Sequence, residues 1–397
     1  MEELLAQSRA LAEATSTQFQ RFLHEKIYWD SRLIGVIGAR GTGKTTLLLQ
    51  VLKEKFGSTG PALYLSLDDI FFTEHRLTTV VRHFFQRGFS HFFLDEVHKY
   101  PGWSREIKNL YDFHPGLYLV FTGSSAVDVL KQEVDLSRRA AMYELPGLSF
   151  REFLNYRLGT HLEAIPLREV LERHEEWVPT ILQKLKPLQY FDDYLRHGYY
   201  PFFKEHLPTY HHRLQRVMRL VVETDLQFIE GISTENVRKL HRLIFILASS
   251  VPFKPNVTKL SERIGIHRNT LVQYIHFLEK ARVINLLQAS GRSISTLQKP
   301  EKVYLENTNL AFALAEMPPN RGNLRETFFL SQVKPVAEVS LPRVGDFLLE
   351  DRYTIEVGGA AKTQRQIKDI KDAYVAADNV ERGALTKIPL WLFGFTY

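Results

Sequence analysis

The sequence has no cysteine, no long apolar run and no low-complexity segment. The lack of cysteine excludes disulfides, thiolate metal ligands and cysteine nucleophiles, and it fits a reducing cytoplasm. No stretch approaches 18 consecutive apolar residues, so we expect no transmembrane helix. The first residues, MEELLAQSRALAEATS, lack the basic start and the apolar core of a signal peptide. We therefore expect a cytoplasmic protein without a membrane partner.

The composition is that of a globular chain with more than one domain. The 397 residues are 44% hydrophobic and 24% charged, which excludes a disordered chain and predicts two or three domains of about 150 residues each. The net charge is +6, and the segment between Lys254 and Lys302 holds nine Lys and Arg against three Glu. This basic patch favours a polyanionic partner, although a solvated helical face has the same composition.

Short apolar runs alternate with helical patterns in the first part of the chain. After a helical segment in residues 1–26, the expected strands are 33–37, 62–67, 90–94, 117–121 and 140–145. The alternation predicts a parallel sheet with crossover helices. Residues 149–250 are mostly helical in pattern, and residues 257–281 read as two helices separated at Gly265. Strand candidates return at 346–349 and 353–357.

One segment matches the phosphate-binding pattern GxxxxGK[ST]. It consists of Gly38, Ala39, Arg40, Gly41, Thr42, Gly43, Lys44 and Thr45, and Thr46 follows. The glycines allow backbone N–H groups to point at phosphates, Lys44 reaches the β- and γ-phosphates, and the Thr45 hydroxyl ligates Mg²⁺. A strand precedes the loop and a helix follows it, so this P-loop predicts ATP and Mg²⁺ as cofactors.

The apolar strand near residues 90–94 is followed by two carboxylates, Asp95 and Glu96. Asp95 stands where a Walker B aspartate holds Mg²⁺, and Glu96 points elsewhere and can polarise the attacking water. An acidic pair at a strand end is common by itself, but after a P-loop it favours an ATPase with its own catalytic base.

Polar residues follow the next two strand candidates. Thr122 or Ser124 can contact the γ-phosphate and orient water, or they can belong to an ordinary turn. Arg138 or Arg139 can reach the ATP of a neighbouring subunit as an arginine finger, or they can form a surface salt bridge. A finger would make the protein a homo-oligomer.

The order of these motifs resembles the prokaryotic AAA-type ATPases that carry a poorly understood C-terminal domain. The resemblance rests on Gly38–Thr46, Phe92–Glu96, FTGSS at 121–125, LPGLSFREF at 145–153, GYYP at 198–201 and KPEKVY at 299–304. It implies ATP binding and hydrolysis. The family usually has a glycine–arginine pair before the fifth strand, whereas this chain has Ser137-Arg138-Arg139, which leaves the position of the finger open.

Residues 257–271 read as a helix-turn-helix with the turn at Gly265. Leu260, Ile264, Ile266, Leu271, Ile275 and Leu278 form its expected buried face. A hairpin from Val283 to Leu297 would complete a winged helix. The residues expected to meet double-stranded DNA are Lys259, His267, Arg268, Asn269, Gln273 and Arg292, with His276 nearby. Winged helices also bind proteins, so a protein partner stays open.

Three acids in the last hundred residues follow a pattern similar to PD-(D/E)XK nucleases. Glu326 lies on an expected helix, Asp346 starts a strand, and Glu356 lies on the next. Such nucleases have a lysine two residues after the last acid, but this chain has Gly358 there, and Lys362 follows four residues later. We expect a nuclease-like fold that does not cleave.

The expected fold is α/β. A P-loop domain of the ASCE/AAA+ class with a helical lid precedes a winged helix and a small α/β domain of restriction-endonuclease-like topology. The expected segments are an N-terminal helix (1–26), the ATPase core (27–148), the lid (149–235), the winged helix-turn-helix (236–298) and the nuclease-like domain (299–397). ATP hydrolysis would change the conformation of a C-terminal region that binds DNA or another partner. Two alternatives stay open, a slow nucleotide-gated switch with a protein partner and an ATP-gated nuclease.

Overall fold

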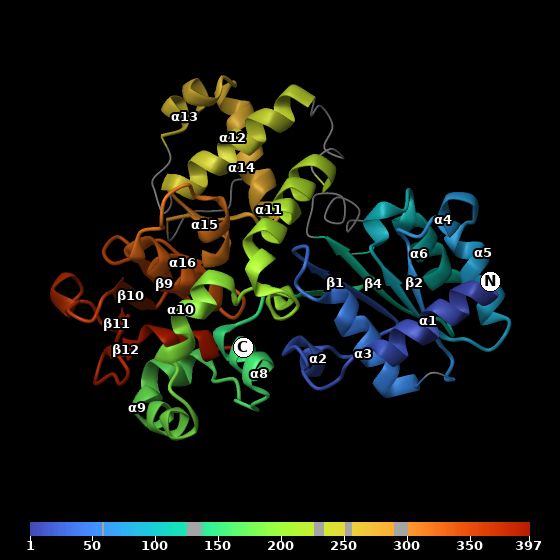
Figure 1. The fold of residues 1–397 in the computed structure, drawn as a ribbon, viewed down its shortest axis with the longest axis horizontal. Coiled ribbons are helices and arrows are strands. Elements are labelled where there is room, and N and C mark those ends of the chain that lie inside the picture. The colour runs from blue at the N-terminus through green and yellow to red at the C-terminus, as the bar shows by residue number, and fades with distance from the viewer. Residues whose placement is uncertain (58, 125–135, 137, 226–233, 251–255, 290–300) are drawn as a thin grey trace. The chain divides into compact units, whose positions relative to one another are not determined.

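The computed structural model describes the chain except for residues 58, 125–135, 137, 226–233, 251–255 and 290–300. The described residues form two compact units, which Figure 1 shows as a ribbon. Unit 1 is Met1–Pro146, and unit 2 is Gly147–Gln227 together with Gly231–Tyr397. Each unit has its own sheet.

Unit 1 is built on a five-stranded parallel sheet with the order β2-β3-β4-β1-β5. Its strands are β1 Leu33–Gly38, β2 Ala62–Ser66, β3 His91–Asp95, β4 Tyr118–Ser124 and β5 Ala141–Glu144. Its helices are α1 Glu2–Ala14, α2 Leu23–Lys26, α3 Lys44–Phe56, α4 Phe71–Glu74, α5 Leu77–Phe85 and α6 Trp103–Phe113, with the 3₁₀ turn η1 Val97–Lys99. The five strands and α3 confirm the elements predicted for this part of the chain.

The sheet of unit 1 is covered on both faces, which explains its continuous apolar strands. Successive side chains of a strand point to opposite faces, so Phe92 joins one core and Phe93 the other. The first core includes α5 and α6, and the second includes α3. Because the strands are parallel, their carboxyl ends lie at one edge of the sheet, where the P-loop, Asp95 and Ser124 meet.

Unit 2 contains the remaining elements. Its first helices are α8 Phe150–Leu158, α9 Leu167–Lys184, α10 Leu188–His197, α11 Tyr210–Leu220 and α12 Thr234–Ser250, with short turns η2 Pro201–Lys204, η3 Leu207–Thr209 and η4 Val221–Asp225. There follow α13 Val257–Ile264, α14 Arg268–Lys280, β6 Ile284–Leu287, β7 Lys302–Leu305, α15 Thr308–Leu314 and α16 Arg321–Val333. A mixed sheet, β12-β11-β10-β9-β8, ends the chain.

The mixed sheet holds the two strands predicted near residues 346–357. Its strands are β8 Val339–Ser340, β9 Phe347–Leu349, β10 Tyr353–Gly358, β11 Ala373–Ala377 and β12 Lys387–Pro389, with turns η5 Gln364–Gln366 and η6 Leu390–Phe395. Strands β8, β9 and β10 pair antiparallel, whereas β10, β11 and β12 pair parallel. Helix α16 packs against β10 and η6.

Hydrogen bonds tie the first helices of unit 2 to its last residues. Ser149 and Glu152 form a capping box at the start of α8, and the Ser149 hydroxyl also donates to the carbonyl oxygen of Tyr397 at 2.6 Å. The Phe150 N–H donates to Gln332 Oε1 at 2.9 Å, and Gln332 Nε2 donates to the Tyr194 hydroxyl at 2.8 Å. The predicted lid, winged helix and C-terminal domain therefore belong to one compact unit.

The hairpin expected from Val283 to Leu297 differs in the structure. Strand β6 pairs antiparallel with β7, so its partner lies beyond Leu297 and beyond the border expected at residue 298. The reason is that Val303, Tyr304 and Leu305 are all buried and supply the second apolar strand. The expected tip, Gly291-Arg292, lies outside the described residues.

Candidate nucleotide-binding site

The P-loop runs from the end of β1 to the start of α3, as predicted. Gly43 caps α3 with a φ of 95°, a conformation that favours glycine. A Cβ at Gly38 would lie 2.4 Å from the carbonyl oxygen of Leu145, so only glycine fits there. The Thr42 hydroxyl donates to Ala39 O at 2.9 Å and closes the loop. Arg40 is half-buried, whereas Gly41, Thr45 and Thr46 are exposed.

The ammonium of Lys44 lies inside the loop. Its Nζ donates to the carbonyl oxygens of Gly38 and Ala39, both at 2.9 Å, and the side chain is buried. The start of α3 adds the positive end of a helix dipole. The loop therefore gathers a cation and the N–H groups of a helix start, a combination that suits phosphate oxygens.

The predicted Mg²⁺ ligands lie together. The Thr45 hydroxyl donates to Asp95 Oδ2 at 2.7 Å, although 50 residues separate the two in the chain. A hydroxyl and a carboxylate are hard oxygen ligands of the kind Mg²⁺ prefers, and Mg²⁺ takes its other ligands from water and phosphate. Among the residues that the structure describes, no group of three or more His, Asp or Glu could hold a metal ion. The pair thus fits a nucleotide-bound Mg²⁺ better than a metal held by protein alone.

Tyr64, a residue that the sequence did not indicate, also binds Asp95. Its hydroxyl donates to Asp95 Oδ2 at 2.8 Å. Burial and the neighbouring Asp95 raise the pKa of the Tyr64 hydroxyl, so it stays a donor. Tyr64 lies on β2, next to β3, and its role depends on the pairing of the two strands.

The structure gives Thr122 and Ser124 different surroundings. The Thr122 hydroxyl donates to Asp95 Oδ1 and accepts the Glu96 N–H at 3.1 Å, so Thr122 orients the acidic pair. Ser124 pairs in register with Gly38, is 3% exposed, and its hydroxyl has no hydrogen-bond partner among the described residues. Ser124 is therefore the better candidate for a γ-phosphate contact.

Glu96, the proposed base, lies between β3 and η1. Its backbone has a φ of 55° and a ψ of 40°, a left-handed conformation that is uncommon for a residue with a side chain. Its carboxylate Oε2 lies 3.4 Å from Nε2 of His98, and its side chain is 24% exposed. The carboxylate is thus within reach of solvent at the edge of the site.

The two candidate arginine fingers also differ. Arg139 forms a bidentate ion pair with Asp112 of α6, at 2.9 and 3.0 Å, and this contact lowers the pKa of the Asp112 carboxyl. Arg138 is exposed. The salt-bridge alternative therefore applies to Arg139, and Arg138 is the remaining candidate for a finger.

A second residue that the sequence did not indicate supports the P-loop. Arg21 lies between α1 and α2 and is 5% exposed. Its Nη1 donates to Thr42 O at 2.6 Å and its Nη2 to Pro146 O at 2.7 Å. The segment before β1 thus stabilises the P-loop through these two hydrogen bonds. Local sequence patterns do not reveal a contact of this kind.

In unit 2, the helix-turn-helix exposes the residues expected to meet DNA. Gly265 ends α13 with a φ of 76°. Leu260, Ile264, Leu271, Ile275 and Leu278 are buried as predicted, whereas Ile266 is half-buried. The exposed residues are Lys259, His267, Arg268, Asn269 and Gln273, while Arg292 lies outside the described residues.

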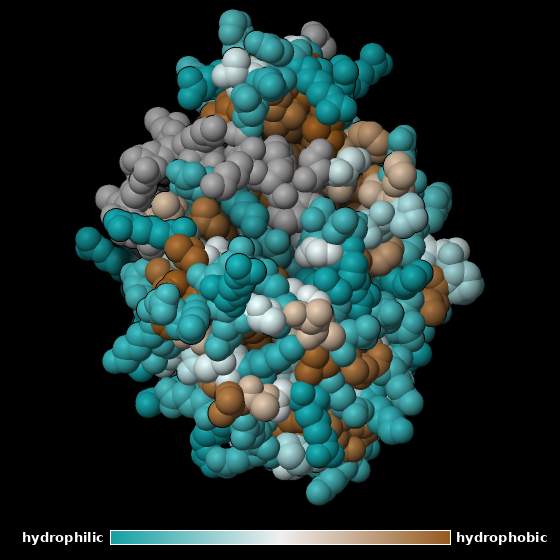
Figure 2. Space-filling view, turned by 90° about the vertical axis from the view of Figure 1, so that its left-hand side faces the viewer, coloured by the Kyte–Doolittle hydropathy of each residue, from teal (hydrophilic) through white to brown (hydrophobic). Residues whose placement is uncertain are grey.

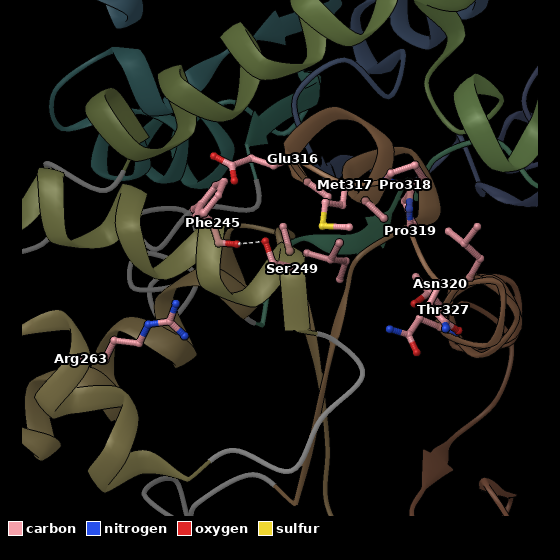
Figure 3. A pocket seen from close by; sticks show the side chains of 15 residues that line it. Phe245, Ser249, Arg263, Glu316, Met317, Pro318, Pro319, Asn320 and Thr327 are labelled. Carbon is pink, nitrogen blue, oxygen red and sulfur yellow. Dashed lines mark hydrogen bonds between the residues drawn. The ribbon is translucent and has the colours of Figure 1, made fainter.

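The surface near these helices combines hydrophilic and hydrophobic residues. Figure 2 shows hydrophobic residues gathered near the top of the molecule, at the height of α12, α13 and α14 in Figure 1. A cavity of about 410 Å³ lies between α12, α13, residues 315–320 and α16. Its lining includes Phe245, Arg263, Glu316 and Met317 (Figure 3). Apolar side chains and charges of both signs share the lining, so it favours no single class of ligand.

The three C-terminal acids influence one another, and Asp346 accepts the Val357 N–H at 2.8 Å. Glu326 Oε2 accepts from Lys302 Nζ at 2.6 Å and from the Tyr304 hydroxyl at 2.9 Å. Glu356 pairs with Lys362. Burial, with smaller effects of Glu326 and Glu356, raises the pKa of Asp346 to about 6.

Gly358 makes room for this lysine. A Cβ at Gly358 would lie 2.6 Å from the Cβ of Lys362, so a side chain there would displace it. Lys362 thus lies beside the last acid although it comes from a later position than the nuclease pattern requires.

Two family models match parts of the chain. Residues 30–154 match the family described as an AAA domain, and residues 188–321 match a domain of unknown function, DUF8612. The first match and the parallel sheet confirm an AAA-type P-loop domain in this part of the chain. The second match names no fold or activity, so the winged helix and the nuclease-like domain stay predictions. Among the described residues, no helix is long and apolar enough to span a membrane.

The chain is similar to an uncharacterized protein, MJ1637, of Methanocaldococcus jannaschii. The two are 25% identical over 290 residues, which are 68% of this chain and 60% of that protein. The chain thus spans about 60% of the length of this curated relative.

The solved structures that match the chain include two of the replication initiator DnaA. The replication initiator DnaA bound to AMPPCP and single-stranded DNA is 16% identical, with 68% of this chain and 92% of that one covered and a TM-score of 0.29. AMPPCP-bound DnaA of Aquifex aeolicus is 15% identical, with 65% and 84% covered and a TM-score of 0.25. C. elegans PCH-2 is 16% identical, with 41% and 49% covered and a TM-score of 0.24. Scores this low carry no argument about function.

Proposed function

We propose that the chain is an ATPase that binds ATP with Mg²⁺ in unit 1 and hydrolyses it. The observation that carries the proposal is the hydrogen bond between Thr45 and Asp95 beside the buried ammonium of Lys44. Asp95 lies 50 residues after the adjacent Lys44 and Thr45, yet all three lie at one edge of the sheet. A glycine-rich turn without a ligand has no need of a carboxylate held by several hydroxyls at this position.

The residues of the site divide the chemistry among them. Lys44 and the N–H groups of the P-loop would bind the β- and γ-phosphates, and a bound Mg²⁺ would neutralise charge on them. Thr45 and Asp95 would hold that ion. Glu96 would accept a proton from the attacking water, and Ser124 would contact the γ-phosphate.

The first experiment measures steady-state ATP hydrolysis and ATP affinity for three variants. Lys44→Ala removes the phosphate cation, so binding and turnover are both lost. Glu96→Gln keeps the shape but removes the base, so kcat falls about 100-fold or more while ATP affinity stays within about threefold. Lys55→Ala, at the other end of α3, is the control and behaves as wild type. Undiminished turnover in Glu96→Gln would refute the assignment of the base.

We further propose that hydrolysis acts on unit 2, and that α14 contacts double-stranded DNA. The support is the exposure of Arg268, Asn269 and Gln273 on one helix that follows the Gly265 turn. Stimulation of the ATPase by DNA, fading with added salt, supports this proposal. A slow rate that DNA does not change supports the alternative, a nucleotide-gated switch with a protein partner.

A second candidate function, Mg²⁺-dependent DNA cleavage, is favoured by one observation, the pairing of Glu356 with Lys362. Against it, Glu326 is occupied by Lys302, and the described acids form no group that could hold a metal ion. We propose that this domain does not cleave. Supercoiled plasmid incubated with Mg²⁺ and ATP then stays intact, and nicking that Glu356→Ala abolishes would establish the nuclease instead.

A further inference from the structure

The turn after β3 brings His98 back beside Glu96. Glu96 adopts the left-handed conformation and the 3₁₀ turn η1 follows at once, so the chain reverses within two residues. The His98 side chain is 4% exposed, and its Nε2 lies 3.4 Å from Glu96 Oε2. A left-handed residue with a side chain costs about 1–2 kcal/mol, and such strain concentrates at functional sites.

The other ring nitrogen of His98 faces β4. The Ser124 N–H donates to His98 Nδ1 at 3.3 Å. Nδ1 is therefore an acceptor, and in the neutral ring the proton is on Nε2. Nε2, the nitrogen that would carry this proton, lies 3.4 Å from Glu96 Oε2. The distance of 3.4 Å is long for a hydrogen bond, and such contacts often shorten when a substrate binds.

His98 thus connects two parts of the proposed catalytic site. Ser124 ends β4 and pairs with Gly38 of the P-loop, so it lies where a γ-phosphate would be contacted. Glu96 follows directly after β3, the neighbouring strand. A buried ring between them moves with both strand ends, because close-packed interiors transmit small displacements.

We propose that His98 is a positioning residue, which holds the Glu96 carboxylate and couples its place to the end of β4. A γ-phosphate that engages Ser124 would shift the Ser124 N–H, and the imidazole would pass this shift to the base. The base is then aligned when ATP is bound. This inference rests on the proposed function, because the alignment of Glu96 matters only if the site hydrolyses ATP.

Two substitutions of similar size separate the two contacts of the ring. His98→Asn places an amide at the depth of Nδ1, so it keeps the contact with Ser124 and loses Glu96. His98→Gln reaches the depth of Nε2, so it keeps a donor for Glu96. We expect kcat of the Asn variant to fall about tenfold or more, while its KM for ATP stays within about threefold of the wild-type value. This pattern is typical of losing an interaction that is made in the transition state. The Gln variant keeps the donor for Glu96 and loses only the link to Ser124, so its kcat should fall by about threefold, less than in the Asn variant.

A merely structural role of His98 predicts a different result. It would impair the Asn and Gln variants alike, or would weaken ATP binding and thermal stability together with kcat. Equal loss in both variants, or an Asn variant with kcat within twofold of wild type, therefore overturns the proposal. His91→Asn, a partly buried histidine at the opposite end of β3, is the control and should leave kcat unchanged.

Double variants distinguish this inference from the proposed function itself. If His98 acts through Glu96, adding His98→Asn to Glu96→Gln produces no further loss of turnover. If Glu96→Gln retains full activity, the assignment of the base fails, and with it the proposal. If Glu96→Gln is inactive and His98→Asn is active, only the role of His98 is wrong. ATP affinity, measured with a fluorescent analogue, confirms in each case that the site is folded.

Discussion

Asp95 shows at the scale of single residues what sequence patterns reveal and what they miss. Lys44, Thr45, Asp95 and Glu96 were predictable because their spacing along the chain reflects local geometry, a loop before a helix and two acids after a strand. Tyr64 lies 31 residues before Asp95 and meets it only through strand pairing. No local pattern records a contact of that kind.

The hydroxyl of Tyr64 should matter for Mg²⁺ rather than for ATP. A hydrogen bond to a charged group contributes about 1.5–3 kcal/mol, and Tyr64 shares Asp95 Oδ2 with Thr45. Tyr64→Phe should therefore leave Asp95 less well oriented and raise the Mg²⁺ concentration for half-maximal ATPase activity about three- to tenfold. Steady-state rates over a Mg²⁺ titration measure this shift.

A matched control lies in the same unit. The Tyr100 hydroxyl also donates to a carboxylate, but this carboxylate is Glu106, whose Oε1 lies at 3.0 Å, and not Asp95. Tyr100→Phe should leave the Mg²⁺ dependence as in wild type. The role assigned to Tyr64 would be wrong if both variants shifted alike, or if Tyr64→Phe changed only thermal stability.

At the scale of elements, the strands of unit 1 were predictable to within a few residues because most of them are apolar runs between turns. The partner of β6 was not. Its partner is β7, whose residues Val303, Tyr304 and Leu305 are buried, and a pairing between separated segments has no signature in a local pattern. Helix α14 was predictable in position, and its function remains a proposal.

The proposed contact of α13 and α14 with DNA predicts a change in salt dependence. Each phosphate contact adds about −0.9 to the slope of log K against log salt concentration. Lys259→Ala and Arg268→Ala should each weaken binding to duplex DNA and reduce the magnitude of the slope by about 1. Fluorescence anisotropy at several salt concentrations measures both quantities.

Arg216→Ala provides the comparison for these variants. Arg216 is exposed on α11, so this substitution removes the same charge from the same unit. The slope of log K against log salt concentration for the Arg216→Ala variant should equal that of wild type. If all three variants reduce the slope equally, binding depends on net charge alone, and α14 has no special part in it.

At the scale of the whole molecule, the domain borders were the least predictable feature. After residue 146, a helical pattern, a basic segment and the returning strand candidates suggested three successive segments. The structure instead joins α8 and α10 to α16 through Gln332, which is fully buried and contacts both Phe150 and Tyr194. Contacts across more than 130 residues leave no trace in local periodicity.

The same contacts predict that the two units respond separately to a substitution. Gln332→Leu leaves the Phe150 N–H without its acceptor and removes a donor from the Tyr194 hydroxyl, so it should destabilise unit 2 by about 2–4 kcal/mol. Unit 1 should be unaffected and should still gain about 2.7 kcal/mol from a nucleotide at 100 times its Kd. Thermal unfolding with and without ATP analogue and Mg²⁺ then shows one transition that responds to nucleotide and another that responds to Gln332→Leu. Gln183→Leu, exposed on α9, should move neither. One transition that responds to both would mean that the chain unfolds as a single cooperative body.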